Sequence, residues 1–222
     1  DAIEAIFNFI RLQPKFVWDA DIEKCFDRIS HAALLSKLHA PQPVMRLIRA
    51  WLKAGIMEDD KLLFPEAGTP QGGVLSPLLA NIALHGFETF VSRTRRKHRV
   101  VVIRYADDCV ILCDDLDTLT EAIAHAEEWL APMGLRIKAA KTHITHTLNP
   151  HQGQVGFDFL GFNVRQYHVS QHRSHQRHAG YKTLIQPSRT AVQRHLRELK
   201  ATIRRLRGAP QAALVAELNP KI

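Results

Sequence analysis

The sequence predicts an α+β fold in which helices pack against an antiparallel sheet. One observation is a hairpin pattern, because two apolar runs, 100–104 and 109–113, flank residues 105–108 in the manner of strand, tight turn and strand. A second is the order helix, strand, helix, hairpin, helix, strand along the chain, which suits an α+β arrangement. A length of 222 residues allows one large domain or a domain and a half.

The N-terminal half gives clear periodic signals. Residues 1–11 have helical spacing of apolar side chains, Pro14 ends that helix, and the alternation over 16–22 predicts a half-buried strand. Ser30 and Ser76 have the character of N-caps, and Pro77 follows Ser76 at a favoured helical position. The other elements expected in this half are helices over 31–38, 43–54 and 77–92 and a short strand over 61–64.

The C-terminal half begins with a capping box, Thr118 and Glu121, which predicts a helix closed by Gly134. Ser188 predicts the N-cap of a second helix that runs to Leu206. Strands are expected over 135–144 and 155–164.

Adjacent carboxylates mark the predicted hairpin. Asp107 and Asp108 stand at its tip, and like charges this close raise each other's pKa unless a cation is present. Asp19 and Asp21 lie on one face of the strand over 16–22, because side chains alternate along a strand. Such carboxylates can hold two metal ions against a phosphoryl group, and oxygen ligands favour Mg²⁺ or Mn²⁺. For Asp107 and Asp108 alone, an ordinary polar turn is the competing interpretation.

A glycine-rich stretch lies between these carboxylate segments. Residues 68–74 contain Gly68, Gly72 and Gly73 and lead into the helix that begins near Ser76. Glycines allow a ligand to approach the main chain closely, and helix N-termini favour phosphate. Taken alone this is a weak signal, but its position between the two carboxylate segments strengthens it.

In this order the segments resemble those of reverse transcriptases, most closely the group II intron-encoded type. The resemblance covers nearly the whole chain. It rests on residues 19–27, 69–81, 105–108, 134–142 and 159–162. It implies a right-hand polymerase palm with an antiparallel sheet and packed helices, partial fingers and the start of a helical thumb.

The resemblance also implies a division of the chain. Residues 1–15 would end the fingers region, and 16–165 would form the palm, with a finger-side insertion at about 40–66. Residues 166–187 would be a basic connector, and 188–222 would start the thumb or maturase domain. Because the upstream finger motifs are absent, the resemblance leaves open whether this chain polymerises alone.

The site residues carried over from the resemblance fall into three groups. Asp21, Asp107 and Asp108 would be catalytic and would bind metal together with the main-chain carbonyl of Ile22, whereas Asp19 would be structural. Phe26 would be a steric gate against a 2′-hydroxyl, the alternative being an ordinary core phenylalanine. The nucleotide-binding residues would be Phe26, Gln71, Gly72 and Lys141, and the primer- and template-binding residues Tyr105, Leu160, Gly161, Arg194, Arg197 and Arg204.

The implied activity is RNA-directed DNA polymerisation by a group II intron-type retroelement. A primer 3′-hydroxyl on an RNA template would attack a dNTP with Mg²⁺, or alternatively Mn²⁺, as cofactor, and intron RNA would be a further partner. Two alternatives stay open: an RNA-binding maturase without polymerase activity, and another bacterial reverse transcriptase of the retron, diversity-generating or CRISPR-associated kind. Phe26 and Gln71 argue against an RNA-dependent RNA polymerase.

Charge placement favours a polyanionic partner. The chain has a net charge of +8, and residues 165–208 contain eleven Lys or Arg but one acid. A second basic cluster lies over 93–99. Nucleic acid is the simplest partner for such an asymmetry, and a solvated basic face is the alternative. The histidines within 167–182 could form a metal cluster, but the lack of apolar anchors favours a flexible connector.

Composition points away from membranes and disulfides. No apolar run approaches the ~18 residues of a membrane span. Cys109 and Cys113 face the same side of a predicted strand, so we expect buried thiols, as for Cys25. The odd cysteine count favours a reducing compartment. The resemblance to group II intron-encoded proteins implies that this compartment is the bacterial cytoplasm.

Overall fold

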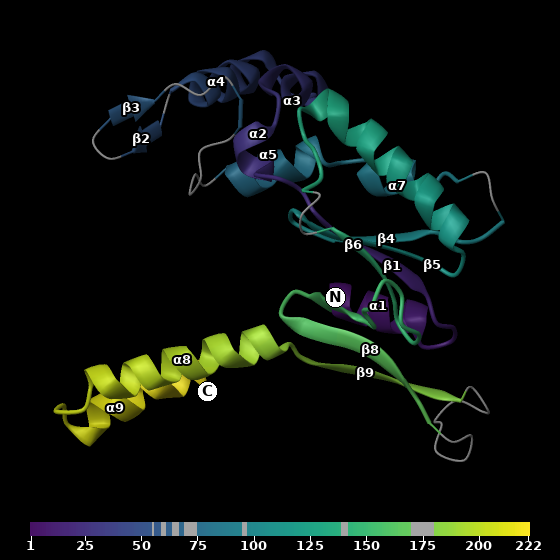
Figure 1. Cartoon of the computed structure of the whole chain (residues 1–222). Helices are drawn as coiled ribbons and strands as arrows, with labels where there is room; N and C mark the ends of the chain where they lie inside the picture. The colour runs from purple at the N-terminus through teal and green to yellow at the C-terminus, as the bar shows by residue number, and fades with distance from the viewer. Residues whose placement is uncertain are drawn as a thin grey trace.

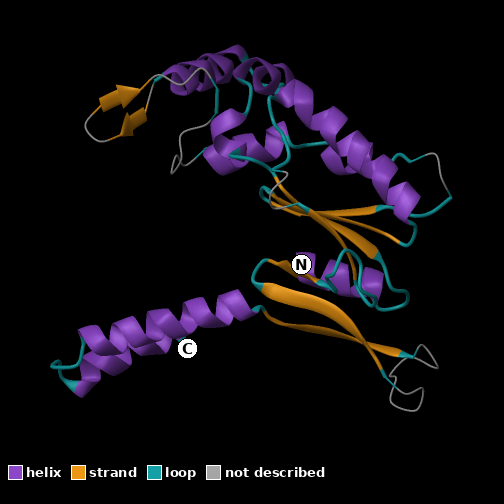
Figure 2. Cartoon of the chain, in the orientation of Figure 1, coloured by secondary structure: helices purple, strands orange, loops and turns teal. Residues whose placement is uncertain are grey.

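The computed structural model describes residues 1–54, 56–58, 61–63, 67–68, 75–94, 97–138, 142–169 and 180–222. It is an α+β fold in which helices cover one face of an antiparallel sheet, while a helix and a smaller sheet lie beneath the other (Figure 1). Figure 2 shows the same division, with most helices above the larger sheet and a helical hairpin extending from the lower one. The predicted fold class is therefore confirmed.

The larger sheet has four strands in the order β4-β5-β1-β6. β1 (Phe16–Asp21) pairs antiparallel with both β5 (Asp108–Cys113) and β6 (His143–His146). β4 (Val101–Tyr105) pairs with β5 and completes the predicted hairpin. Because side chains alternate along β1, Val17, Asp19 and Asp21 face one side, and Trp18 and Ala20 face the other.

Helices bury the face that carries Trp18 and Ala20. Ile111 of β5, Phe87 and Leu119 are fully buried there and form one hydrophobic core. Cys25 and Cys109 lie in the same core, and Cys113 is buried too, so the expectation of buried thiols is confirmed. The helices on this side are α2 (Cys25–Arg28), α3 (His31–Lys37), α4 (Gln42–Lys53), α5 (Ser76–Ala83), α6 (Phe87–Val91) and α7 (Leu116–Leu130), followed by a 3-10 turn over Ala131–Met133.

A second core fills the opposite face of the sheet. Val17, Val110 and Leu112 pack there against Ile6 and Ile10 of α1 (Ala2–Ile10) and against the smaller sheet. That sheet has the order β7-β8-β9, with β7 at Phe157–Phe159, β8 at Phe162–His168 and β9 at Tyr181–Pro187.

Two outlying hairpins complete the fold (Figure 1). β2 (Ile56–Glu58) pairs with β3 (Lys61–Leu63) beyond α4. α8 (Arg189–Arg205) and α9 (Gln211–Leu218) form a helical hairpin that continues from β9 and ends in a 3-10 turn over Asn219–Lys221. An ion pair joins Arg205 to Glu217, and Lys221 Nζ lies 3.4 Å from Glu198 Oε1. Within the described residues, no helix has the length and apolar character needed to cross a bilayer.

Several local predictions are wrong. The helix expected over 77–92 is two helices, because Gly86 adopts φ 89° between α5 and α6, a conformation that glycine tolerates. Ser76 is the first helical residue rather than the N-cap. Thr118 and Glu121 do not open α7, because Asp115 is the N-cap and accepts a hydrogen bond from Thr118 N.

The strand predictions in the C-terminal half also need correction. No single strand spans the described part of the expected 135–144 segment. Ile137 forms an isolated bridge with Ile22, and the strand β6 begins only at His143. The strand expected over 155–164 is a hairpin of β7 and β8. Within the connector expected over 166–187, residues 166–168 end β8, and residues 181–187 form β9, which pairs with β8. Residues 170–179 lie outside the described ranges.

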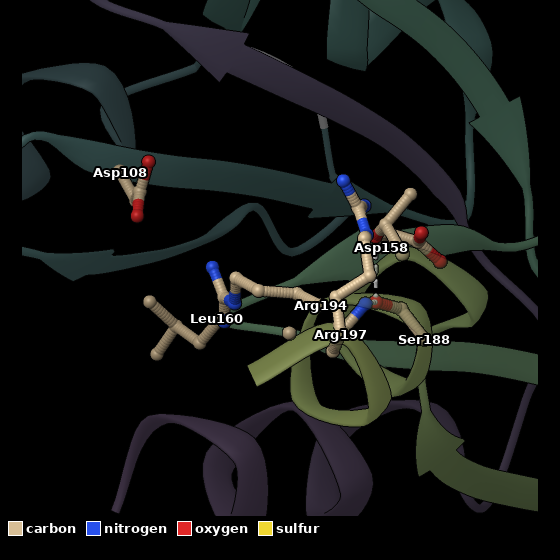
Figure 3. Close-up of a pocket in the computed structure, with 9 residues that line it drawn as sticks. Asp108, Asp158, Leu160, Ser188, Arg194 and Arg197 are labelled. Atoms are coloured by element: carbon tan, nitrogen blue, oxygen red, sulfur yellow. Dashed lines mark hydrogen bonds between the residues drawn. The ribbon is translucent and has the colours of Figure 1, made fainter. Parts of the chain in front are cut away.

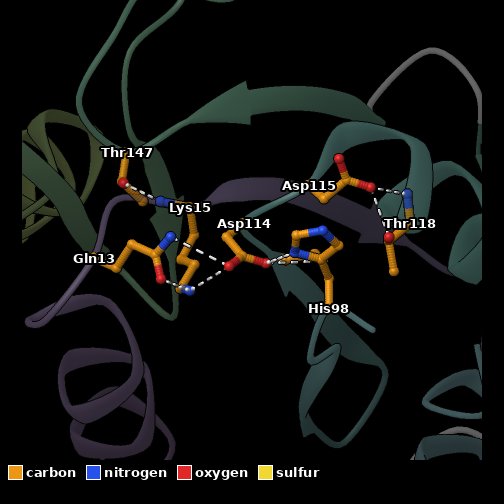
Figure 4. Close-up of polar contacts among 8 residues, drawn as sticks. Gln13, Lys15, His98, Asp114, Asp115, Thr118 and Thr147 are labelled. Atoms are coloured by element: carbon orange, nitrogen blue, oxygen red, sulfur yellow. Dashed lines mark hydrogen bonds and ion pairs between the residues drawn. The ribbon is translucent and has the colours of Figure 1, made fainter. Parts of the chain in front are cut away.

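A partly buried polar network links several segments at the end of β5. Asp114 Oδ2 accepts a hydrogen bond from Gln13 Nε2 at 3.2 Å and lies 3.8 Å from Lys15 Nζ, while His98 Nδ1 lies 3.1 Å from Oδ1 (Figure 4). Burial alone would raise the pKa of Asp114, but Lys15 and His98 more than offset it, so this pKa is lowered. Lys15 N also donates to Thr147 Oγ1 at 2.9 Å.

Gln166 of β8 extends this network across the second core. Thr147 Oγ1 donates to its Oε1 at 2.6 Å, and its Nε2 donates to Ile10 O at 2.8 Å and to Thr183 Oγ1 at 3.1 Å. One amide thus joins α1, β9 and the segment after β6.

We expect Gln166→Ala to lower the free energy of unfolding by about 2–4 kcal/mol, because it leaves buried donors and acceptors without partners. Urea denaturation is the measurement. Gln186→Ala, at an exposed position of β9, is the matched control and should change stability by less than about 0.5 kcal/mol. Equal effects of the two substitutions would contradict the structural role of Gln166.

Candidate active site

The predicted carboxylates meet at one end of the larger sheet. Asp21 is the last residue of β1 and Asp108 the first of β5, and the two are direct partners in the β1–β5 register. Tyr105 is the partner of Asp108 in β4 and is 60% exposed. Since directly paired residues have adjacent side chains on the same face, the carboxyl groups of Asp21 and Asp108 share one face of the sheet.

Asp107 lies in the turn between β4 and β5. The turn has two residues, Ala106 and Asp107, because Tyr105 pairs with Asp108. Ala106 has φ 56°, a left-handed conformation that costs an L-residue about 1–2 kcal/mol. Backbone strain of this kind persists only where neighbouring structure holds it, and it clusters at active sites.

The pKa of Asp19 reflects both its burial and the carboxylates around it. Burial, followed by the carboxylates of Asp108 and Asp158, raises its pKa to about 6. Asp21 contributes in the same direction. Neighbouring carboxylates of this kind favour a cation, because like charges raise each other's pKa.

The main chain beside Asp21 offers a further oxygen. Ile22 forms an isolated antiparallel bridge with Ile137. The hydrogen bonds of this bridge run from Lys138 N to Asp21 O and from Glu23 N to Arg136 O, each at 2.9 Å. The bridge therefore does not use the carbonyl of Ile22, which remains a candidate ligand.

These groups fit a hard divalent cation by chemistry, since every candidate ligand is an oxygen. Among the described residues, however, no three His, Cys, Asp or Glu side chains are gathered closely enough to hold a metal ion as they stand.

A pocket of about 590 Å³ opens beside Asp108 (Figure 3). Its lining combines Asp108 and Asp158 with the turn between β7 and β8 and with the first turns of α8. Arg194 and Arg197 of α8 supply positive charge to it. The other lining residues are Leu160, Gly161, Ser188, Thr190 and Ala191.

The turn between β7 and β8 consists of Leu160 and Gly161, since Phe159 pairs with Phe162. Both residues have positive φ, 49° for Leu160 and 81° for Gly161, as a two-residue type I′ hairpin requires. Ser188 N donates to Gly161 O at 2.8 Å, and Ser188 Oγ accepts from Ala191 N at 3.1 Å. The start of α8 is thereby fixed to this turn.

Not every predicted site residue joins this arrangement. Gln71, Gly72 and Lys141 lie outside the described residues. Phe26 is partly buried and packs against the core beneath the helices. Arg204 lies in the last turn of α8 and is not among the residues that line the pocket.

Asp158 and Arg104 were not predicted as site residues. Asp158 Oδ1 accepts a hydrogen bond from Asn163 Nδ2 at 2.7 Å, and Arg104 donates to the carbonyl of Ala106 at 2.9 Å. The sequence offered one indication for each residue: Asp158 directly precedes Phe159, and Arg104 directly precedes Tyr105. Both neighbours belong to segments that carry the family resemblance.

Comparisons with known proteins identify the family of the chain. The reverse transcriptase (RNA-dependent DNA polymerase) family matches residues 7–164, so the chain belongs to the reverse transcriptase family. It is 43% identical over 82 residues to the group II intron-encoded protein LtrA of Lactococcus lactis subsp. cremoris, covering 36% of this chain and 14% of LtrA.

More distant relatives extend the similarity. The RNA-directed DNA polymerase from mobile element jockey of Drosophila funebris is 31% identical over 144 residues, covering 57% of this chain and 16% of that protein. Apo telomerase from Candida tropicalis, truncated from its C-terminal domain, has a TM-score of 0.57 at 14% identity, over 74% of this chain and 36% of that one. The last comparison supports the palm-like fold alone.

We expect Asp19→Asn to stabilise the metal-free protein above about pH 6. The folded pKa of Asp19 is raised from 3.8 to about 6, so its contribution to stability is fully present below pH 3.8 and is lost as the pH rises through 6. The gain at pH 7.5 should be about 1–2 kcal/mol after solvent screening. Urea unfolding at pH 5 and 7.5 measures it. Asp117→Asn, at an exposed position, is the control, and a pH-independent difference would contradict the prediction.

Proposed function

We propose that the protein is an RNA-directed DNA polymerase of a group II intron-type retroelement. It would transfer dNTPs to a primer 3′-hydroxyl on an RNA template, with Mg²⁺ as cofactor. The single observation that carries the proposal is the pairing of Asp21 with Asp108 at a sheet end that opens onto a pocket bearing Arg194 and Arg197. The family membership and the similarity to LtrA support it.

The two sides of the pocket suggest separate tasks. Carboxylates at the sheet end would provide oxygen ligands, and Ile22 O would add another. Two bound Mg²⁺ ions would lower the pKa of the attacking hydroxyl and neutralise the departing pyrophosphate. Arg194 and Arg197 would bind phosphates of the duplex, because guanidinium groups match phosphate oxygens in charge and geometry.

The turn of Leu160 and Gly161 would position the primer strand. It lies between Asp108 and α8 in the lining of the pocket, where a primer end would have to pass to reach the carboxylates. Tyr105 is exposed beside Asp108 and would contact the primer terminus. Arg204, farther along α8, would contact the duplex away from the reacting atoms.

Nucleotide selection is proposed for the helix side of the site. Phe26 follows β1 in α2 and would exclude a 2′-hydroxyl, which favours dNTPs over ribonucleotides. Gln71, Gly72 and Lys141 would contact the incoming nucleotide. Gly68, three residues before Gln71, is held by two contacts: Gly68 N donates to Ile29 O at 2.8 Å, and His31 Nε2 lies 2.6 Å from Gly68 O.

The wider assignment follows from the same similarity. Residues 1–15 would end a fingers region, 16–165 would form the palm and 188–222 would begin the thumb. Intron RNA would be a second partner, bound through the basic surface in a bacterial cytoplasm. An RNA-binding maturase without polymerase activity is the second candidate function, supported by the similarity to the group II intron-encoded protein LtrA and by the excess of basic residues over 165–208.

Primer extension is the decisive experiment. We expect the longest natural form of the protein that contains this chain to extend a DNA primer on an RNA template with dNTPs and Mg²⁺, and to use ribonucleotides poorly. Asp107→Ala should reduce extension by at least about 1000-fold, since it removes a carboxylate needed only for chemistry.

The control for this experiment is binding of the same RNA–DNA duplex, which Asp107→Ala should leave intact. A folded, duplex-binding protein that shows no metal-dependent extension would refute the polymerase assignment and support the maturase alternative. Asp117→Asn serves as the active control, because Asp117 is exposed in the first turn of α7 and follows the end of β5 opposite to Asp108.

A second prediction concerns α8. Replacing Arg194 and Arg197 by alanine together should weaken duplex binding and lower the slope of log K against log salt by about 1–2, because each lost phosphate contact contributes about 0.9. Binding across 50–300 mM KCl, roughly the range in which such slopes are linear, measures it. The control replaces Arg46 and Arg49 on α4 by alanine, which removes the same charge elsewhere. An equal change in slope for this control would contradict the proposal that Arg194 and Arg197 bind the duplex in the pocket.

A further inference from the structure

Arg104 lies directly behind the catalytic turn. It precedes Tyr105 in β4 and is the register partner of Cys109, whose side chain is buried in the core beneath the helices. Paired residues point to the same face, so Arg104 lies on the helix side of the sheet. Asp21 and Asp108 lie on the other side, and Arg104 therefore does not share their face.

One guanidinium group joins three separate elements. Arg104 Nε donates to Glu88 Oε1 of α6 at 2.7 Å. Its Nη1 donates to Asn81 Oδ1 of α5 at 3.1 Å and to Ala106 O in the turn at 2.9 Å. The Arg104 side chain itself is only 13% exposed, whereas Asn81 and Ala106 are exposed.

The contact with Ala106 acts where the turn is least stable by itself. Ala106 has φ 56°, which an alanine disfavours relative to the right-handed or extended regions. A hydrogen bond to its carbonyl oxygen fixes the peptide group that connects Ala106 to Asp107. The orientation of Asp107 thus depends on the position of the Arg104 guanidinium.

The contact with Asn81 links the turn to the nucleotide side of the site. Asn81 belongs to α5, which begins at Ser76 just after the Gln71 segment. A shift of α5 would move one acceptor of Arg104, while Glu88 holds the guanidinium from α6. The catalytic turn and the helix after the Gln71 segment are therefore joined through a single side chain.

We infer that Arg104 is a positioning residue that holds the turn of Ala106 and Asp107 in its catalytic orientation and couples this turn to α5. The inference rests on the proposed polymerase function. An isolated surface ion pair with Glu88 would contribute little, but a mostly buried guanidinium with three acceptors has a geometric role. Lysine cannot reproduce it, because an ammonium group lacks the planar, spaced donors of arginine.

The test compares Arg104→Gln and Arg104→Lys with the control Arg136→Gln. Arg136 also forms an ion pair, with Glu23, but does not contact the turn. Arg104→Gln should lower kcat for primer extension by about 10–100-fold, the effect of a misplaced catalytic group, and leave the Kd for duplex within about threefold. Arg104→Lys should be nearly as slow as Arg104→Gln, and Arg136→Gln should be within about threefold of the unmodified protein.

A second substitution separates positioning from general destabilisation. Adding Ala106→Gly to Arg104→Gln should restore kcat by about three- to tenfold, since glycine adopts a left-handed conformation without the cost that alanine bears. If Arg104→Gln does not fold, Asn81→Ala removes one contact at an exposed side chain and should lower kcat by a smaller factor.

An activity-independent readout keeps this inference distinct from the proposed function. The ¹³Cβ chemical shift of Ala106 in selectively labelled protein reports its backbone conformation, and it should move in Arg104→Gln but not in Arg136→Gln. An unchanged Ala106 shift, full activity of Arg104→Lys, or no recovery on adding Ala106→Gly would each overturn the inference. Absence of extension in the unmodified protein would overturn the proposed function alone.

Discussion

The register between β1 and β5 is the constraint on which the site depends. It places Asp21 opposite Asp108 and, on the same face, Val17 opposite Leu112. Val17 and Leu112 are fully buried in the second core, whereas Ile111 is fully buried in the first. A slip of one residue would turn every side chain of β5 to the other face. The two cores therefore fix the register, and the register fixes which carboxylates meet.

Charges of both signs line the pocket. Asp108 lies at the sheet end, and α8 contributes Arg194 and Arg197, which lie near Asp158 in Figure 3. Burial, followed by neighbouring carboxylates, raises the pKa of Asp19 on the same face of the sheet. A substrate that presents both phosphates and phosphate-bound cations matches such a lining, because each charge finds a complementary partner.

The sequence predicted the parts of the fold that local periodicity determines. β1, the β4–β5 hairpin, α1 and α8 all follow from apolar spacing or from caps within a few residues. The hairpin of β7 and β8 was missed because Leu160 is not a turn residue by type, and its φ of 49° depends on neighbouring strands and on Ser188. β9 was missed because its pairing with β8 is a tertiary contact that a basic, histidine-rich composition does not reveal.

The site shows the same division. Asp21, Asp107 and Asp108 were predictable from the motif order, but the contacts of Arg104 with Asn81 and Glu88 were not, since these partners lie 23 and 16 residues away. Likewise, the approach of Asp158 to Asp19 arises only when the second sheet packs beneath the first. Motifs single out the groups proposed for the chemistry, whereas tertiary packing determines how these groups are held.

Two hairpin turns contribute to this site, and each has a non-glycine residue in the left-handed region: Ala106 in one and Leu160 in the other. Each turn accepts a hydrogen bond from outside its own hairpin loop, Ala106 O from Arg104 and Gly161 O from Ser188 N. Strained turns of this kind keep their shape only through such contacts. α5 is connected to the first turn through the hydrogen bond between Asn81 and Arg104, and α8 to the second through its N-cap Ser188. In the proposed function these two helices would meet the nucleotide and the duplex. Displacing either helix would change the contact that supports its turn, so the proposed substrate contacts are physically linked to the placement of Asp107 and Leu160.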